Sequence, residues 1–149
     1  MLASRMKFRA LLLSLLVSIL PTMAAEQAFP PTAPGVAEFK TLPAGVLLKS
    51  SGKGSYFDQS NQLFRPLFNY ISTHDIAMTT PVEAKIDGAA MYFWVAASEQ
   101  TKVAGNTPGV EVLTIPERRV ASRGVRGSYS RDNFEKTRDQ LVVWLAQQP

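Results

Sequence analysis

The chain has 149 residues, which is enough for one domain with a hydrophobic core, and it carries a formal net charge of +4. It has no cysteine, which excludes disulfides, thiolate catalysis and zinc–thiolate sites. Three of its 16 cations lie in the first 25 residues, and the remaining 13 face 12 acids, a net charge of +1. A nearly neutral remainder argues against nucleic acid as a partner.

Residues 1–25 have the composition of a secretory signal peptide. A basic start precedes an apolar run over residues 10–20, and small residues follow the run. This run is shorter than the roughly 20 residues that a membrane-spanning helix needs, which favours a cleaved leader over a transmembrane anchor. We therefore expect a periplasmic or secreted protein that has no membrane segment after cleavage.

The mature chain is expected to begin with a short tail. Residues 26–35 contain three prolines and predict an extended N-terminal tail. The folded domain is then expected over residues 36–149. Its first strand is predicted at residues 45–50, because a short apolar run there is followed by the glycine-containing turn 51–54.

The next segment predicts an amphipathic helix. Leu63, Leu67 and Tyr70 recur at the spacing of one helix face. Pro66 lies inside this pattern, where a proline removes a hydrogen bond and clashes with the preceding turn. We expect either a kink at Pro66 or a helix whose regular part begins near Arg65.

The middle of the chain predicts a β-hairpin. Apolar and polar residues alternate over residues 82–87, and a second apolar run follows Gly88 over residues 89–98. Residues 91–95 are apolar on both faces, which is typical of a central strand covered on both sides. The remaining predicted elements are a polar loop (99–109), two strands (110–115 and 119–125) and a final helix (131–147).

The final helix carries cap and core signals. Ser130 or Asp132 is expected to cap its N-terminus, because both side chains accept hydrogen bonds from free backbone amides. The predicted inner face carries Phe134, Leu141 and Leu145, with Trp144 at its margin.

The tripeptide Gly-Ser-Tyr occurs twice, at residues 54–56 and 127–129. Each copy follows a predicted strand and precedes a predicted helix, which indicates an internal repeat, although three identical residues also arise by chance. If the halves are equivalent, the first is strand–helix–strand–strand and the second ends after its helix.

Residues 64–71 and 76–84 together resemble the SOUL haem-binding protein family. In that family a helix ending in Leu-Phe-x-Tyr-Ile leads into a strand that begins Met-Thr-x-Pro-Val, as residues 67–71 and 78–82 do here. The resemblance implies an α+β fold, a distorted antiparallel β-barrel of two strand–helix–strand–strand repeats with two flanking helices, here without the last hairpin.

The resemblance also implies a ligand and a site. Members of the family are described as binding haem or related tetrapyrroles in an apolar groove beside the first helix. The matching residues here are Leu63, Leu67, Tyr70 and Met78. Arg65 lies beside them and suits a haem propionate, because a guanidinium pairs with a carboxylate in bidentate geometry. Haem is thus the expected cofactor, bound non-covalently.

His74 is the only histidine and hence the first candidate for an axial ligand of haem iron. The alternative is structural, a histidine that interacts with the last carbonyls and the dipole of the helix. Met78 is a weaker candidate, because a methionine that enters a strand usually fills the core. A site held by apolar contact and a propionate pair alone fits these residues as well.

The sequence contains no nucleophile elbow, phosphate loop or HExxH motif, so an enzyme is not expected. The first hypothesis is an exported haem or tetrapyrrole carrier, buffer or sensor. The alternative is a non-haem small-ligand or protein-interaction module on the same fold. A third possibility is a truncated chain, whose unpaired strand edges would favour aggregation.

Overall fold

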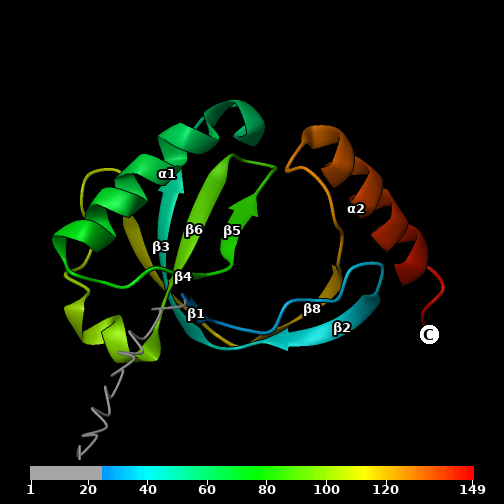
Figure 1. Cartoon of the computed structure of the whole chain (residues 1–149), viewed down its shortest axis with the longest axis horizontal. Helices are drawn as coiled ribbons and strands as arrows, with labels where there is room; N and C mark the ends of the chain where they lie inside the picture. The colour runs from blue at the N-terminus through cyan, green and yellow to red at the C-terminus, as the bar shows by residue number, and fades with distance from the viewer. Residues whose placement is uncertain (1–24) are drawn as a thin grey trace, which may run out of the picture.

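Residues 25–149 form a mixed α+β structure with two helices and mainly antiparallel sheets (Figure 1). These are the residues that the computed structural model describes. All but the last residue of the predicted signal peptide therefore lie outside the described part. Within the described part, no helix is both long and apolar enough to cross a bilayer.

A four-stranded antiparallel sheet in the order β5-β6-β3-β7 forms the centre of the fold. The predicted hairpin is confirmed, because β5 pairs with β6 along its whole length. The predicted central strand is confirmed too, since β6 lies between β5 and β3 and five of its six residues are buried. The strands are β3 (Gly45–Ser51), β5 (Val82–Lys85), β6 (Ala90–Val95) and β7 (Glu111–Ile115).

Two smaller sheets complete the described strands. β2 (Ala37–Leu42) pairs antiparallel with β8 (Arg118–Arg123), and β1 (Glu26–Gln27) pairs parallel with β4 (Thr79–Thr80). Hydrogen bonds thus join the strands into three separate sheets, and closure into one barrel stays a prediction.

The segment that was expected to be a tail is extended, but it lies against the rest of the domain. β1 pairs with β4, and farther along the Phe29 ring packs edge-on against Trp94 with 5.4 Å between ring centroids. The Thr32 hydroxyl is 2.7 Å from both a Glu38 carboxylate oxygen and the Ser122 hydroxyl. These contacts join the proline-rich segment to the four-stranded sheet and to the β2–β8 sheet.

Helix α1 (Tyr56–Thr73) lies against one face of the four-stranded sheet. It follows the N-cap residue Ser55 and continues through Pro66, so the prediction that its regular part begins near Arg65 is wrong. A proline inside a helix removes one backbone hydrogen bond. Here that loss is offset because Leu63 and Leu67, on either side of Pro66, are at most 2% exposed.

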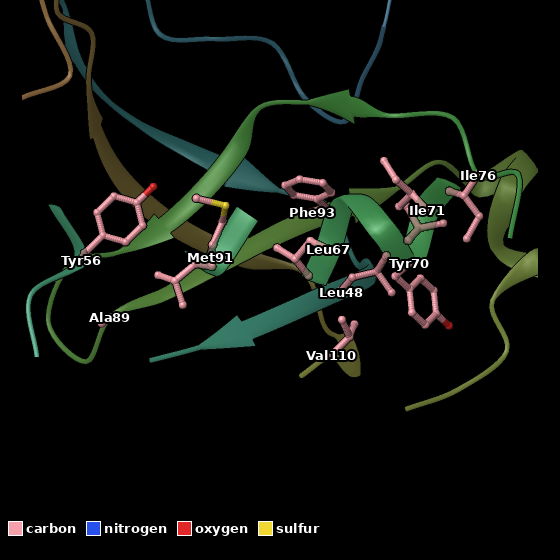
Figure 2. Close-up of a cluster of buried hydrophobic side chains, with 12 residues drawn as sticks. Leu48, Tyr56, Leu67, Tyr70, Ile71, Ile76, Ala89, Met91, Phe93 and Val110 are labelled. Carbon is pink, nitrogen blue, oxygen red and sulfur yellow. The ribbon is translucent and has the colours of Figure 1, made fainter. Parts of the chain in front are cut away.

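The contact between α1 and the sheet forms the hydrophobic core (Figure 2). Leu48 from β3 and Leu67 from α1 are completely buried. Burying a side chain of this size contributes roughly 1.5–3 kcal/mol relative to exposure. The other buried members of the cluster are Tyr56, Leu63, Tyr70, Ile71, Ile76, Ala89, Met91, Phe93, Val95 and Val110.

Helix α2 (Arg131–Leu145) packs beside the β2–β8 sheet, apart from α1 (Figure 1). The Ser130 side chain accepts a hydrogen bond from the Asn133 backbone N–H, which confirms the predicted cap. The predicted inner face is partly wrong, because Leu145 is 38% exposed whereas the Trp144 ring packs on Phe39 at 5.1 Å. The inner face of α2 therefore includes Trp144 in place of Leu145.

The two Gly-Ser-Tyr copies occupy different positions relative to their helices. In the first copy Ser55 is the N-cap and Tyr56 is buried in the core. In the second copy Ser128 lies two residues before the cap, and Tyr129 is 82% exposed. The order strand, turn, helix therefore recurs, but the identical residues are not structural equivalents.

Replacing Leu67 with alanine should lower the free energy of unfolding by about 2–5 kcal/mol, because it leaves a cavity in the core. Leu145→Ala is the matched control, since this leucine is partly exposed. We expect the control to change stability by no more than about 1 kcal/mol. Urea unfolding of both variants measures the difference, and equal losses would contradict this assignment of the core.

Candidate functional site

Three of the predicted groove residues lie inside the core. Leu63, Leu67 and Tyr70 are 2%, 0% and 4% exposed, and their helix face packs on β3 and β6. The Tyr70 hydroxyl already has two hydrogen-bond partners within the protein. It donates to the Gly105 carbonyl at 2.9 Å and accepts from the Ala104 amide at 3.0 Å. In this structure these side chains have no surface to offer to a ligand.

The remaining predicted residues do not complete a groove. Arg65 is exposed on α1, away from the buried face. Met78 is half-buried and packs against the core cluster, as expected for a core-filling methionine. The structure therefore brings the predicted apolar residues together in the hydrophobic core and leaves Arg65 in solvent. An apolar stripe in the sequence of a helix does not show whether that face packs in the core or lines a binding groove.

His74 is the C-cap residue of α1. Its Nδ1 atom lies 2.8 Å from the Tyr70 carbonyl oxygen, and its ring stacks on the Tyr70 ring with 4.3 Å between centroids. A nitrogen beside a carbonyl oxygen donates its proton, which leaves Nε2 as the acceptor of a neutral ring. These contacts match the structural role at the end of a helix.

A 3₁₀ helix, η1 (Ala97–Lys102), occupies the start of the predicted polar loop and secures the end of α1. The Lys102 ammonium donates to the Asp75 carbonyl at 2.6 Å and to the Glu99 carboxylate at 2.9 Å. Glu99 also accepts from the Ala77 amide at 3.1 Å. The hydrogen bond from Lys102, followed by that from Ala77, holds the pKa of Glu99 below its ordinary value.

This lowered pKa predicts a pH-dependent contribution to stability. Glu99 stabilises the fold above the ordinary carboxyl pKa of 4.5, and the effect is lost as the pH falls through the lower folded-state pKa. Glu99→Gln should therefore lower the melting temperature at pH 7, and the deficit should shrink in acid. Asp87→Asn, an exposed change in the hairpin turn, is the control. A deficit that is constant with pH would contradict the ionic origin.

An open cavity of about 340 Å³ lies between the two helices. Five segments line it, namely the first turn of α1, the end of β5 with the residue after it, the end of β8, the loop 124–130 and the inner face of α2. Figure 1 shows β5 and α2 on opposite sides of this region. The lining residues are Phe57, Ala84, Ile86, Arg123, Val125, Ser128, Tyr129, Ser130, Asn133, Phe134, Thr137, Arg138 and Leu141.

An ion pair joins β5 to β8 next to Ala84, a residue of the cavity lining. The Arg118 guanidinium donates to both carboxylate oxygens of Glu83 at 2.8 Å, and the Trp94 indole donates to the same carboxylate at 3.3 Å. Ile86 and Val125, which follow these two strands in the chain, line the cavity. The two sheets are also joined by the two-residue connections 43–44 and 116–117.

The cavity combines apolar walls with positive charge. Among the described residues that line it, two are arginines and none is a carboxylate. Arg123 donates through Nε to Gln140 at 3.1 Å, and Arg138 donates to Asp139 at 3.0 and 3.1 Å. Each guanidinium has five N–H donors, so both keep further donors for a ligand.

Aromatic side chains form one wall and the rim of the cavity. The rings of Phe57 and Phe134 lie 6.2 Å apart, which links the start of α1 to α2. Tyr129 stands at the rim and Tyr56 lies in the core behind it. Burial raises the pKa of Tyr56, and the charge of Tyr129 raises it further. The cavity therefore suits an apolar molecule that carries carboxylates.

The family model described as SOUL heme-binding protein matches residues 31–149. The chain belongs to the SOUL family. Membership confirms the resemblance of the helix and the Met-Thr-x-Pro-Val strand, and it supports haem or a related tetrapyrrole as the ligand. A comparison with curated proteins gives no match.

The residues of the cavity fit the ligand of the SOUL family. Its volume lies within the range of about 300–1,000 Å³ that is typical of small-molecule sites. Its apolar walls suit a macrocycle, and its two arginines suit the propionates. The lining of the cavity does not include the predicted groove residues Leu63, Leu67 and Tyr70. Phe134 and Leu141 do show helical spacing, but nothing local indicates that α2 faces β5.

Filling the cavity should block the binding of an apolar anion. Leu141→Trp adds volume to the cavity wall, so the fluorescence enhancement of 1-anilinonaphthalene-8-sulfonate should be lower than with the unmodified protein. Val143→Trp is the control, because Val143 is 60% exposed on α2. Equal enhancement by both variants would mean that the dye binds elsewhere. Circular dichroism verifies that both variants fold.

Proposed function

We propose that this SOUL protein is an exported tetrapyrrole-binding protein that holds haem non-covalently, as a carrier, buffer or sensor. Family membership together with the arginine-containing apolar cavity carries the proposal. Export rests on the composition of residues 1–25. The proposed site is the cavity between α1 and α2, because the groove residues Leu63, Leu67 and Tyr70 are buried in the core.

The residues of the cavity would bind the ligand through burial and charge. Phe57, Phe134 and Leu141 would cover the macrocycle, and buried apolar area contributes about 25 cal/mol per Å². Arg123 and Arg138 would donate hydrogen bonds to the propionates and fix the orientation of the ring. Bound haem supplies a redox-active iron, whereas these side chains supply affinity and exclude water from one face.

The alternative is a module that binds a non-haem small ligand on the same fold. One observation favours it: apart from Tyr129, the residues that line the cavity carry none of the usual axial ligands of haem iron. Apolar walls with two guanidinium groups suit many flat carboxylates. Metal-free protoporphyrin IX distinguishes the two, because equal affinity for it and for hemin would show that iron contributes nothing to binding.

Hemin titration tests the proposal directly. The purified protein should give a saturable Soret shift at micromolar concentration, and no saturable shift would refute haem binding. The double variant Arg123→Ala/Arg138→Ala should bind hemin about tenfold or more weakly, the value expected for losing charge-assisted hydrogen bonds. Arg65→Ala is the control, because this exposed arginine does not line the cavity. The reverse pattern would place the site beside α1.

A further inference from the structure

Two strand edges beside the cavity carry unpaired backbone groups. β8 pairs with β2 along its whole length, and β5 pairs with β6 in the same way. In the described part of the chain, neither strand has a partner strand on its other edge. Ala84 of β5 and Arg123 of β8 both line the cavity, so the two open edges lie at its walls. An open edge of this kind is a template for pairing with a further strand.

The register of β8 shows which of its amides are free. Directly after β8, the Gly124 amide donates to the Val36 carbonyl at 3.0 Å, which marks a hydrogen-bonded pair. In an antiparallel ladder such pairs alternate with pairs whose backbone groups point away from the partner strand. The register of β2 with β8 runs without interruption. The amides of Arg119, Ala121 and Arg123 therefore point away from β2.

The open edges of β5 and β8 are joined by side chains and not by a backbone ladder. Arg118 of β8 donates to both carboxylate oxygens of Glu83 on β5, but the two strands are not neighbours in any described sheet. On β5, the Ala89 amide donates to the Ile86 carbonyl across the hairpin turn. By the same alternation, the amides of Glu83 and Lys85 point away from β6. Both edges thus offer backbone groups to an added strand.

The chain already adds a strand next to one of these edges. β4 and β5 both lie beside β6, and only Pro81 separates them in the chain. The N-terminal strand β1 pairs parallel with β4, and the Ala28 amide donates to the Thr80 carbonyl at 2.8 Å. This pairing ends at Thr80. An extended segment therefore covers the β4 part of the edge and leaves the β5 part open.

The side chains around the open edges determine which kind of segment fits. Arg123 and Arg138 line the cavity, and its described lining contains no carboxylate. A guanidinium pairs with a carboxylate through charge-assisted hydrogen bonds. Phe57, Phe134 and Leu141 form apolar walls, which favour apolar side chains. The segment that fits is extended and carries both acidic and apolar residues.

A second copy of this chain is a poorer occupant of the edges. β8 has three arginines among its six residues, so pairing two β8 edges would bring like charges together, which destabilises a ladder. The β5 edge carries Glu83, but that carboxylate is already paired with Arg118. The charge of the open edges therefore favours an acidic segment from another protein.

We propose that the open edges of β5 and β8 accept an extended acidic segment of a partner protein as an added β-strand. Backbone hydrogen bonds to the edges would give affinity, and carboxylates that meet Arg123 and Arg138 would give specificity. The inference goes beyond the function proposed above and does not depend on haem binding. Because both use the cavity, hemin and the segment would exclude one another.

Isothermal titration calorimetry with an unlabelled peptide tests the inference. The probe is a peptide of alternating valine and glutamate, 6 residues long like β8. The purified protein should bind it with saturable heat, whereas the matching peptide of valine and lysine should give none. N-methylation of the glutamate amides removes donors along one edge of the peptide. It should weaken binding about tenfold or more, as expected for lost backbone hydrogen bonds.

Ala121→Pro tests the same hydrogen bonds from the side of the protein. It removes an amide that points away from β2, and a proline on the open side of an edge strand leaves the ladder intact. Peptide binding should weaken about tenfold or more. Thr41→Pro is the matched control, because Thr41 pairs with Arg119 and its amide points away from β8 on the opposite edge of this sheet. Urea unfolding verifies that both variants fold.

The other outcomes distinguish this inference from its alternatives. Equal binding of the glutamate and lysine peptides would overturn it, and so would equal binding by Ala121→Pro and Thr41→Pro. Dimerisation that Ala121→Pro abolishes, without peptide binding, would assign the edge to a second copy instead. Hemin binding without peptide binding would overturn this inference and keep the proposed function. Peptide binding without hemin binding would do the reverse.

Discussion

The packing of α1 on the four-stranded sheet is the contact on which the rest of the structure depends. Leu48 and Leu67 meet there without any exposed surface, and the ring hydroxyl of Tyr70 ties the helix to loop 104–105. Interiors packed at this density do not admit a planar ligand without losing their own contacts. The face of α1 that the sequence predicts as a binding surface therefore forms part of the hydrophobic core. That face of α1 is not open to a ligand in this structure.

An open cavity lies instead between α1 and α2. The Arg118–Glu83 ion pair joins β8 to β5 at one point, and beyond it the apolar walls belong to elements from both halves of the chain. The arginines of the cavity come from β8 and α2, whereas Phe57 comes from α1, so segments far apart in the sequence form the cavity. A cavity made in this way depends on the relative placement of these segments more than on any local motif.

Local signals predicted much of the fold. The alternation over residues 82–87, the apolar strand that follows it and the Ser130 cap each depend on neighbours in the sequence, and the structure confirms all three. The predicted start of the regular helix near Arg65 was wrong, because the sequence shows that Pro66 removes one hydrogen bond but does not show the burial that offsets this loss. The candidate site could not be predicted, because the approach of α2 to β5 depends on contacts between distant segments.

Helix α2 contains no buried residue, unlike α1, and leaves Val142 and Val143 more than half exposed. Segments with few buried contacts open at a lower free energy than the core, as separate units of local unfolding. The wall of the cavity that carries Phe134 and Arg138 is thus its least stable wall. Local opening of α2 would widen the cavity while the core under α1 stays folded. Access to the cavity and stability of the domain thus depend on different helices.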